Sequence, residues 1–507
     1  MAIYLDRTLI PDPEHIPSDV LAYVVRVHNA RLGRLETLHR YYTGRQPVRS
    51  RVDGAAPVSV PYAHYITTSL VGMYLGEPIK YDTITPPAHD DDVLSPGAIH
   101  ASIAPDGTLS RHTWKQPAVD ISPILDIYNH QSISEEDAEI GRYLSEYGEA
   151  YELEYADEDA QPHTKAIDPR FCEMIRDDTM DHKKIAFMMI DRVERISGIP
   201  FYRVYVYTES TVTTYKSDTA SATDCKFAAE PGSEQPHFFG EVPAVEYHSG
   251  AGNGSLGDFE TVTSLIDAVC TLATDRVEDK EKFVDSFLAL YGADLTPEQI
   301  DEFKQEKMIG LPESARAEYI SKQLDEASTQ VLIDYLVKEI HKQSMTVDMT
   351  DEAFGTASGQ ALKMKLLSMT MLIKRKIRRT EKGLKKRFEM YDHFLHIKSN
   401  FPLIDKCTIS PIFTVSIPID EQSVVSIVTQ LQGIVDDETL LSLLWFVKDP
   451  RSVLEKVKIQ KAQEQQSYLD TFGISAKRNE NIGTEQVDDT KQEQGTDGTE
   501  QSGGDAR

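Results

Sequence analysis

The glycine-rich segment Gly252-Asn253-Gly254-Ser255-Leu256-Gly257 matches the GxGxxG pattern of dinucleotide-binding folds. It lies between a predicted strand at Val242 to Tyr247 and a long predicted helix that begins at Asp258. In such folds the glycines let the backbone approach a pyrophosphate, and the helix N-terminus stabilises its charge. Here the helix is too long for a βαβ unit, and no second strand ending in an acid follows about twenty residues later. We interpret the segment as a flexible joint, with a nucleotide-binding enzyme using Gly252 to Gly257 as the alternative.

Three acidic residues, Asp348, Asp351 and Glu352, could in principle bind a metal ion. Their spacing fits neither the calcium loop of an EF-hand nor a two-metal nuclease. Acids at the start of a helix satisfy its free N–H groups and its dipole, and this explains them equally well. The histidines form no HxH or HExxH motif, and there is no nucleophile elbow and no Walker A lysine. We therefore predict no catalytic residue, no metal site and no cofactor.

A basic run, Lys374, Arg375, Lys376, Arg378 and Arg379, is the strongest local concentration of charge. From Lys363 to Arg387 there are eleven Lys and Arg residues and one acid. Such a face could contact DNA phosphates, because Lys and Arg dominate phosphate binding. It could also pair with acidic surfaces of neighbouring subunits. Both interpretations stay open at this point.

The composition limits the class of protein. A chain of 507 residues is too long for one core, so two to four domains are expected. The net charge of −29 argues against a protein that coats nucleic acid, although an acidic surface lets DNA pass without adhering. No apolar run is long enough for a transmembrane helix, and Met1 to Asp12 lacks the pattern of a signal peptide. The four cysteines are widely spaced, which favours a reducing compartment.

The first half of the chain reads as a mixture of helices and strands. Helices are predicted at Ser18 to Tyr42, Pro61 to Ile79, Pro123 to Asn129 and Ser134 to Gly148, with Ser18 and Ser134 as N-caps and Asp137 completing a capping box. Strands are predicted at Tyr147 to Tyr155, His163 to Ile167, Lys184 to Ile196, Tyr202 to Tyr207, Thr211 to Lys216 and Val242 to Tyr247. Thr83 to Pro117 is predicted to be a surface insertion, and Ser217 to Glu234 a polar loop.

The second half contains two long helical patterns around a compact insert. The first helix is predicted from Asp258 to Tyr291, and the returning helix carries Val331, Tyr335 and Ile340. A polar, glycine-containing break follows, and then a basic helix from Leu362 to Ile397. Further strands are predicted at Pro402 to Pro418, and two more helices at Asp420 to Phe446 and Pro450 to Gln466. The acidic tail from Ser475 to Arg507 is predicted to be disordered.

Several short segments, taken in order, resemble the Gp6-like portal proteins of tailed bacteriophages. The segments are Tyr41-Tyr42-x-Gly44, Gly72-x-Tyr74-Leu75-Gly76-x-Pro78-Ile79-x-Tyr81, Tyr147-Gly148-x-Ala150-Tyr151, Ile167-x-Pro169, Val242-Pro243-Ala244-Val245, Gly257-Asp258-Phe259-Glu260, Leu265-Ile266-Asp267-Ala268, Asp348-Met349-x-Asp351-Glu352-x-Phe354 and Ser358-Gly359-x-Ala361-Leu362. The resemblance covers roughly Arg26 to Glu455. Val347 departs from it, because that family usually has proline before Asp-Met, so a less rigid loop entrance is expected.

The resemblance implies an α+β, mainly helical portal fold that assembles as a ring, with wing, stem, clip and crown regions. The implied regions are a wing at 1–257 with the 83–117 insertion, stem helices at 258–291 and 325–345, a clip at 292–324, a channel loop at 346–358, a basic helix and strands returning to the wing at 359–418, a crown at 419–466 and a disordered tail at 467–507. The implied function is that of a non-enzymatic DNA conduit at a capsid vertex.

The resemblance also assigns residues and partners. The channel-loop residues that would face DNA are Thr346, Asp348, Met349, Thr350, Asp351, Glu352, Phe354 and Ser358. The clip residues that would contact partners are Asp294, Glu298, Glu302, Lys307, Glu313 and Arg316. The implied partners are further copies in a dodecameric ring, double-stranded DNA, the terminase large subunit, the major capsid or scaffolding protein, and head-completion or tail connector proteins. The implied location is the virion, with assembly in the host cytoplasm and no membrane contact.

Overall fold

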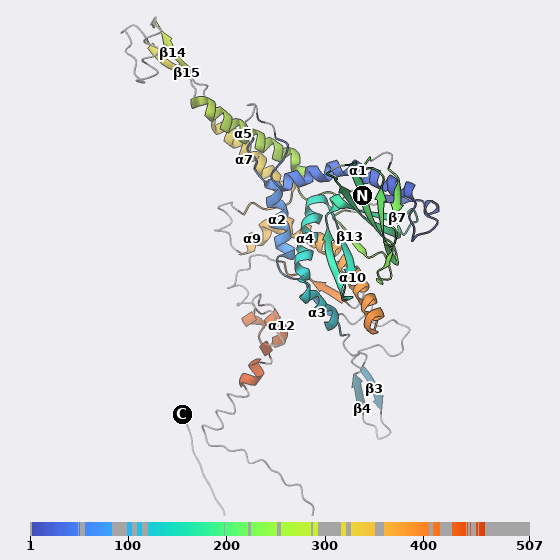
Figure 1. Ribbon diagram of the computed structural model, residues 1–507. Coiled ribbons are helices and arrows are strands. Elements are labelled where there is room, and N and C mark those ends of the chain that lie inside the picture. Colours follow the sequence, from blue (N-terminus) through green and yellow to red (C-terminus); the bar gives the residue numbers. More distant parts are fainter. Residues whose placement is uncertain are drawn as a thin grey trace, which may run out of the picture. The chain divides into compact units, whose positions relative to one another are not determined.

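The computed structural model divides the chain into two compact units, Met1–Pro418 and Ile419–Arg507 (Figure 1). It describes residues 3–48, 50, 56–83, 99–103, 109–113, 120–196, 198–221, 225–250, 255–284, 287–292, 316–320, 326–349, 359–404, 409–415, 428–442, 444, 447, 453–454 and 456–461. Helical residues outnumber strand residues among the named elements, as an α+β, mainly helical chain requires.

A seven-stranded sheet forms one layer of the first unit, and the N-terminal half of helix α1 (Ser18–Tyr42) covers it. The strand order is β1-β7-β8-β9-β10-β11, with β12 also paired to β10. The strands are β1 (Ile3–Leu5), β7 (Cys172–Asp177), β8 (Lys184–Val193), β9 (Phe201–Tyr207), β10 (Thr211–Ser217), β11 (Phe227–Ala229) and β12 (Gln235–Pro236). A short 3-10 helix, Arg7–Leu9, follows β1, and another, Pro169–Phe171, precedes β7.

A second layer contains the largest apolar core. It combines the C-terminal half of α1 with α2 (Tyr62–Leu75), α4 (Ile133–Tyr147) and a three-stranded antiparallel sheet of order β13-β5-β6. The strands of that sheet are β5 (Glu149–Ala156), β6 (Pro162–Ile167) and β13 (Ala244–His248). A smaller core lies around α3 (Ser122–His130).

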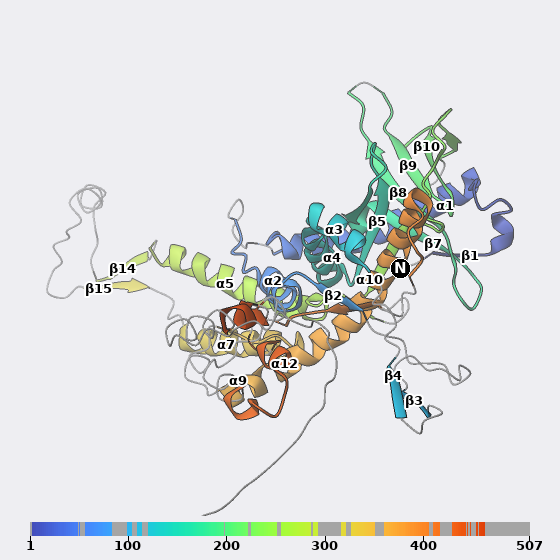
Figure 2. The same cartoon turned by 90° about the horizontal axis from the view of Figure 1, so that it is seen from below.

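Two helices, α5 (Thr263–Val284) and α7 (Glu326–Gln343), lie side by side (Figure 2). A 3-10 turn, Glu260–Val262, precedes α5. The strands β14 (Phe287–Tyr291) and β15 (Arg316–Ile320) pair as an antiparallel hairpin between the two helices. The predicted helix therefore ends earlier than expected, because its last apolar stretch is a strand.

The basic helix is confirmed, with a break at Leu366 that separates α9 (Gly359–Lys365) from α10 (Leu367–Ser399). Buried residues in the first part of α10 belong to the large core, and those in its C-terminal half belong partly to that core and partly to the core around α3. After α10, strand β16 (Ile409–Ile412) pairs with β2 (Lys80–Thr83). In the second unit, the named helix is α12 (Asp437–Ser442).

Several local predictions need correction. The predicted insertion contains a hairpin of β3 (Ile99–Ile103) and β4 (Leu109–Thr113), and β11 interrupts the predicted polar loop. Both predicted N-caps are wrong. Pro17 precedes α1, and the Ser18 hydroxyl accepts a hydrogen bond from Phe227 N–H. Ser132, in a left-handed conformation, precedes α4.

The helices predicted from Ser18 to Gly148, the strands predicted from Tyr147 to Tyr247, the turn at Asp157 and the glycine end of α1 agree with the structure to within a few residues. In the described part of the chain, the strands predicted at Pro402 to Pro418 are represented by β16 (Ile409–Ile412). The helix predicted at Asp420 to Phe446 is interrupted by a turn with a bridge between Gln432 and Val435, and α12 is its named part. The predicted disordered tail and most of the insert between β14 and β15 lie outside the described residues.

Candidate functional site

The junction between β13 and α5 is closely packed. A Cβ atom added to Gly257 would lie 2.3 Å from the carbonyl oxygen of Glu146, and one added to Gly148 would lie 2.5 Å from the backbone of Leu256. Gly148 has φ +81°, which favours glycine. The backbones therefore approach each other where α4 ends and the α5 segment begins, and a side chain on either glycine would separate them.

This geometry contradicts the dinucleotide-binding alternative. Strand β13 pairs antiparallel with β5, and the strand after α5 pairs antiparallel with β15. A βαβ unit needs two parallel strands in one sheet on either side of the helix. Gly252 and Gly254 lie outside the described residues, but Gly257 packs against protein backbone. The segment has the position of a joint between a strand and a long helix.

A buried ion pair holds this joint to the basic helix. Lys376 Nζ of α10 lies 2.7 Å from Asp258 Oδ2, and the two side chains are 2% and 5% exposed. The same carboxylate oxygen accepts a hydrogen bond of 2.6 Å from the Ser145 hydroxyl. Asp258 N–H donates to the Ser145 carbonyl. The start of the α5 segment is thereby bonded both to the C-terminal turn of α4 and to α10.

The five residues of the predicted basic face separate into two groups. Lys374, Arg375 and Arg378 are exposed, and they have no ion-pair partner in the described part of the chain. Lys376 does not lie on that face, because it is buried against Asp258. Arg379 is half-buried and donates to the Gly250 carbonyl at 2.5 Å. Three of the five predicted residues are therefore exposed.

The start of the predicted channel loop lies within the described residues. Thr346 is buried beside Ser344 and His341, so its side chain does not face solvent in the protomer. Asp348 is half-buried and Met349 is 49% exposed. Val347, where a less rigid entrance was expected, packs against the large core. Thr350, Asp351, Glu352, Phe354 and Ser358 lie outside the described residues.

The predicted clip contacts are mostly untested by the geometry. Arg316, the first residue of β15, is exposed. The other five residues, Asp294, Glu298, Glu302, Lys307 and Glu313, lie outside the described residues. They remain predictions.

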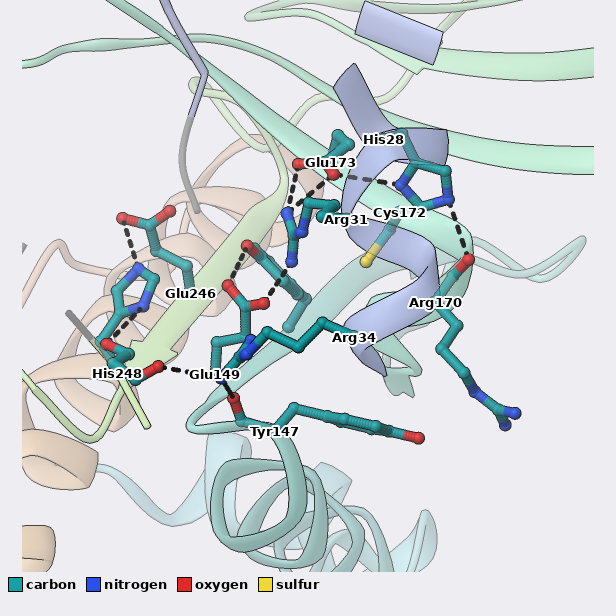
Figure 3. Close-up of polar contacts among 12 residues, drawn as sticks. His28, Arg31, Arg34, Tyr147, Glu149, Arg170, Cys172, Glu173, Glu246 and His248 are labelled. Atoms are coloured by element: carbon teal, nitrogen blue, oxygen red, sulfur yellow. Dashed lines mark hydrogen bonds and ion pairs between the residues drawn. The ribbon is translucent and has the colours of Figure 1, made fainter. Parts of the chain in front are cut away.

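An ion-pair network at Arg31 was not predicted from the sequence (Figure 3). Arg31 of α1 donates to both oxygens of Glu173, at 2.6 and 2.7 Å, and to Glu149. His28 Nδ1 lies 3.0 Å from Glu173 Oε1. Burial opposes the charge of Arg31, but the carboxylates of Glu173 and Glu149 outweigh it and raise the pKa of the guanidinium. The network ties α1 to β7 and β5, so its role is architectural.

Arg34 of α1 extends this connection to the 3-10 turn that precedes α5. Its side chain donates to both carboxylate oxygens of Glu260, at 2.6 and 2.7 Å. It also donates to the Tyr147 carbonyl (Figure 3). Glu260 also accepts from Gly257 N–H at 2.9 Å. Cys172 lies in the same region, and burial raises the pKa of its thiol well above the ordinary value. A neutral, buried thiol is a poor nucleophile.

A second unpredicted cluster surrounds Arg387 of α10. This side chain is fully buried, with Nη1 2.7 Å from Asp137 Oδ1 and Nε 3.0 Å from Glu152 Oε2. Glu154 lies nearby, where its Oε2 accepts from the Thr164 hydroxyl at 2.5 Å and its Oε1 has no hydrogen-bond partner. Burial, followed by the charge of Glu152, raises the pKa of Glu154 well above its ordinary value. Burial in the folded protein therefore favours the protonated form of Glu154.

The described ranges contain no group of three or more His, Cys, Asp or Glu side chains arranged to hold a metal ion. None of the helices in those ranges combines the length and the apolar character needed to span a bilayer. What the structure does present is a pair of long helices, a packed joint at their base, and a basic helix bonded to that joint.

Comparison with known proteins identifies the family of this chain. Residues 21–467 match the family described as "Phage portal protein, SPP1 Gp6-like". The chain belongs to this family of phage portal proteins. Among solved structures, a chain of "Neck of empty GTA particle computed with C6 symmetry" is 11% identical, with 81% of this chain and 93% of that chain covered and a TM-score of 0.38. A search of curated proteins found no match.

Proposed function

We propose that this portal protein forms a closed ring of identical subunits, a dodecamer, at one vertex of a capsid. The ring surrounds a channel through which double-stranded DNA enters during packaging and leaves during ejection. The terminase large subunit docks on it during packaging, and head-completion or tail connector proteins bind later. The capsid or scaffolding protein surrounds it in the virion. The protein itself catalyses no reaction, and ATP hydrolysis occurs only when terminase is added.

The observation that carries the proposal is an uncovered apolar face on the paired helices. Val331 and Tyr335, one helical turn apart on α7, are 69% and 59% exposed. Leu332 on the same helix and Val277 on α5 are also exposed. Helices with apolar stripes bury them in stable proteins, and identical subunits in a ring do so with one repeated contact. In a ring, helices α5 and α7 of the neighbouring subunit would cover this apolar face.

The channel assignment extends the same proposal. Residues 346–358 follow α7 directly and would line the narrowest part of the ring, with Asp348 weakening phosphate contacts and Met349 offering an apolar contact. Lys374, Arg375 and Arg378 form an exposed cationic face on α10. This face would contact either DNA or an acidic surface of the next subunit. The helices α5 and α7 would form the stem, the segment between them the clip, and residues 419–466 the crown.

Electron microscopy of the purified full-length protein tests the proposal. We expect rings with a central hole. The double variant Val331→Glu with Tyr335→Glu places charges on the apolar face and should give monomers with unchanged circular dichroism. Lys338→Ser, an exposed position on the same helix, is the matched control and should leave the rings intact. Solid or monomeric particles of the wild-type protein under every assembly condition would contradict the proposal.

A further inference from the structure

The hydroxyl of Tyr65 contacts the chain at two points immediately after α7. Tyr65 lies on α2, and its hydroxyl donates to the Val347 carbonyl at 2.9 Å. The same oxygen accepts a hydrogen bond of 3.2 Å from Met349 N–H. One side chain therefore bonds to the backbone on both sides of Asp348. We refer to this pair of hydrogen bonds as the Tyr65 bridge.

The aromatic ring that carries this hydroxyl is held in place. It is half-buried against the large core, and it meets the His341 ring edge-on, with centroids 5.6 Å apart at 88°. Tyr62, one turn earlier on α2, makes a similar edge contact with His341 at 6.1 Å. His341 belongs to the last turn of α7 and is buried. Two tyrosines of α2 thus pack on the C-terminal end of α7.

The backbone between α7 and the bridge is also fixed. Met345 has φ +58°, a left-handed conformation that ends the helix and turns the chain. Thr346 N–H donates to the His341 carbonyl at 3.0 Å. The Thr346 and Ser344 hydroxyls are 2.7 Å apart, and the Thr346 hydroxyl lies 3.4 Å from His341 Nδ1. Local hydrogen bonds therefore fix the conformation of residues 344–347, and the Tyr65 bridge fixes the backbone as far as residue 349.

We infer that Tyr65 is a positioning residue for the channel loop. It sets the point at which the chain leaves the body of the subunit, because the first backbone N–H beyond Asp348 is bonded to α2. During DNA passage, force on the channel loop is transmitted to α2 through this hydroxyl. It is also transmitted through the backbone to α7. This inference rests on the proposed function, since it assigns Tyr65 a role in DNA passage.

The test compares full-length Tyr65→Phe with Tyr62→Phe. The first variant removes the bridging hydroxyl and keeps the ring on His341. The second is the matched control, because the Tyr62 hydroxyl makes no hydrogen bond within the described part of the chain. Both should form the same rings as the wild type. Hydrogen–deuterium exchange is measured at the Met349 amide, and DNA packaging is measured with terminase and procapsids.

Tyr65→Phe should accelerate exchange at Met349 by about two- to tenfold, which is the factor that one net hydrogen bond supplies. It should also lower the amount of DNA packaged per ring, whereas Tyr62→Phe should change neither quantity. If Tyr65→Phe left hydrogen exchange at the Met349 amide unchanged, the Tyr65 bridge would be refuted. Faster exchange with wild-type packaging would overturn the positioning role. If the wild-type rings do not package DNA, the proposed function fails, and the exchange comparison still decides whether Tyr65 holds the backbone.

Discussion

Replacement of Lys376 by methionine should be strongly destabilising, although the residue lies within a run of surface cations. Its ammonium is 2.7 Å from Asp258 Oδ2, and both side chains are almost fully buried. Methionine fills a similar volume but leaves the Asp258 carboxylate buried with only the Ser145 hydroxyl and its surroundings to stabilise it. Removal of one partner from a buried ion pair costs about 3–5 kcal/mol. Lys374→Met, two residues earlier on the exposed face, should change the free energy of unfolding by less than about 0.5 kcal/mol.

Urea unfolding of the full-length protein, followed by circular dichroism, measures this difference. Asp258→Asn combined with Lys376→Met should be less destabilised than Lys376→Met alone, because no unpaired charge is then buried. A Lys376→Met protein as stable as Lys374→Met would refute the reasoning. If Lys376 instead acted on DNA, the two variants would weaken DNA binding alike without a difference in stability.

Two further predictions concern the buried carboxyl of Glu154 and the channel loop. Folding raises the pKa of Glu154 above the unfolded value of about 4.3, so the native state binds one more proton than the unfolded state between these two pKa values. The free energy of unfolding therefore falls as the pH rises through this range, by about 1.4 kcal/mol per pH unit, until the folded pKa is reached. Glu154→Gln should remove this loss, so its stability relative to the wild type should increase as the pH rises above about 4.3 in urea titrations; parallel profiles would contradict this. Replacement of residues 350–358 by a short glycine linker should leave ring assembly intact and impair packaging, because residues 346–349 keep their contacts with α2 and the core. Normal packaging by such rings would remove the channel-loop assignment.

The periodic elements of the fold could be predicted from the sequence because each carries its own pattern. Helix α1 was predicted at its observed bounds, and the strands at Glu149–Ala156 and Phe201–Tyr207 follow from alternation. The end of α5 could not be predicted in this way, since the apolar run at Phe287–Tyr291 suits a helix or a strand equally. Its partner, Arg316–Ile320, is distant in sequence, so only tertiary structure selects the strand.

The candidate site was predicted less completely. The exposed cations Lys374, Arg375 and Arg378 were identified, but the run alone does not distinguish them from Lys376. A helical signal was present: Lys376 lies three residues after Ile373 and four before Thr380, and both are buried. No such signal exists for Tyr65, whose partners are 282 and 284 residues away along the chain. Contacts of that kind depend on the packing of whole elements.

Helix α10 has a mechanical consequence. Its 33 residues extend about 50 Å. Along that length it is bonded to the base of α5 at Lys376 and to α4 and β5 at Arg387, and it packs in two separate cores. A force applied at its N-terminal end is therefore shared by the ion pairs at Lys376 and Arg387 and by the packing in the two cores. In the proposed ring, no single attachment of α10 would carry the full force exerted by a docked motor.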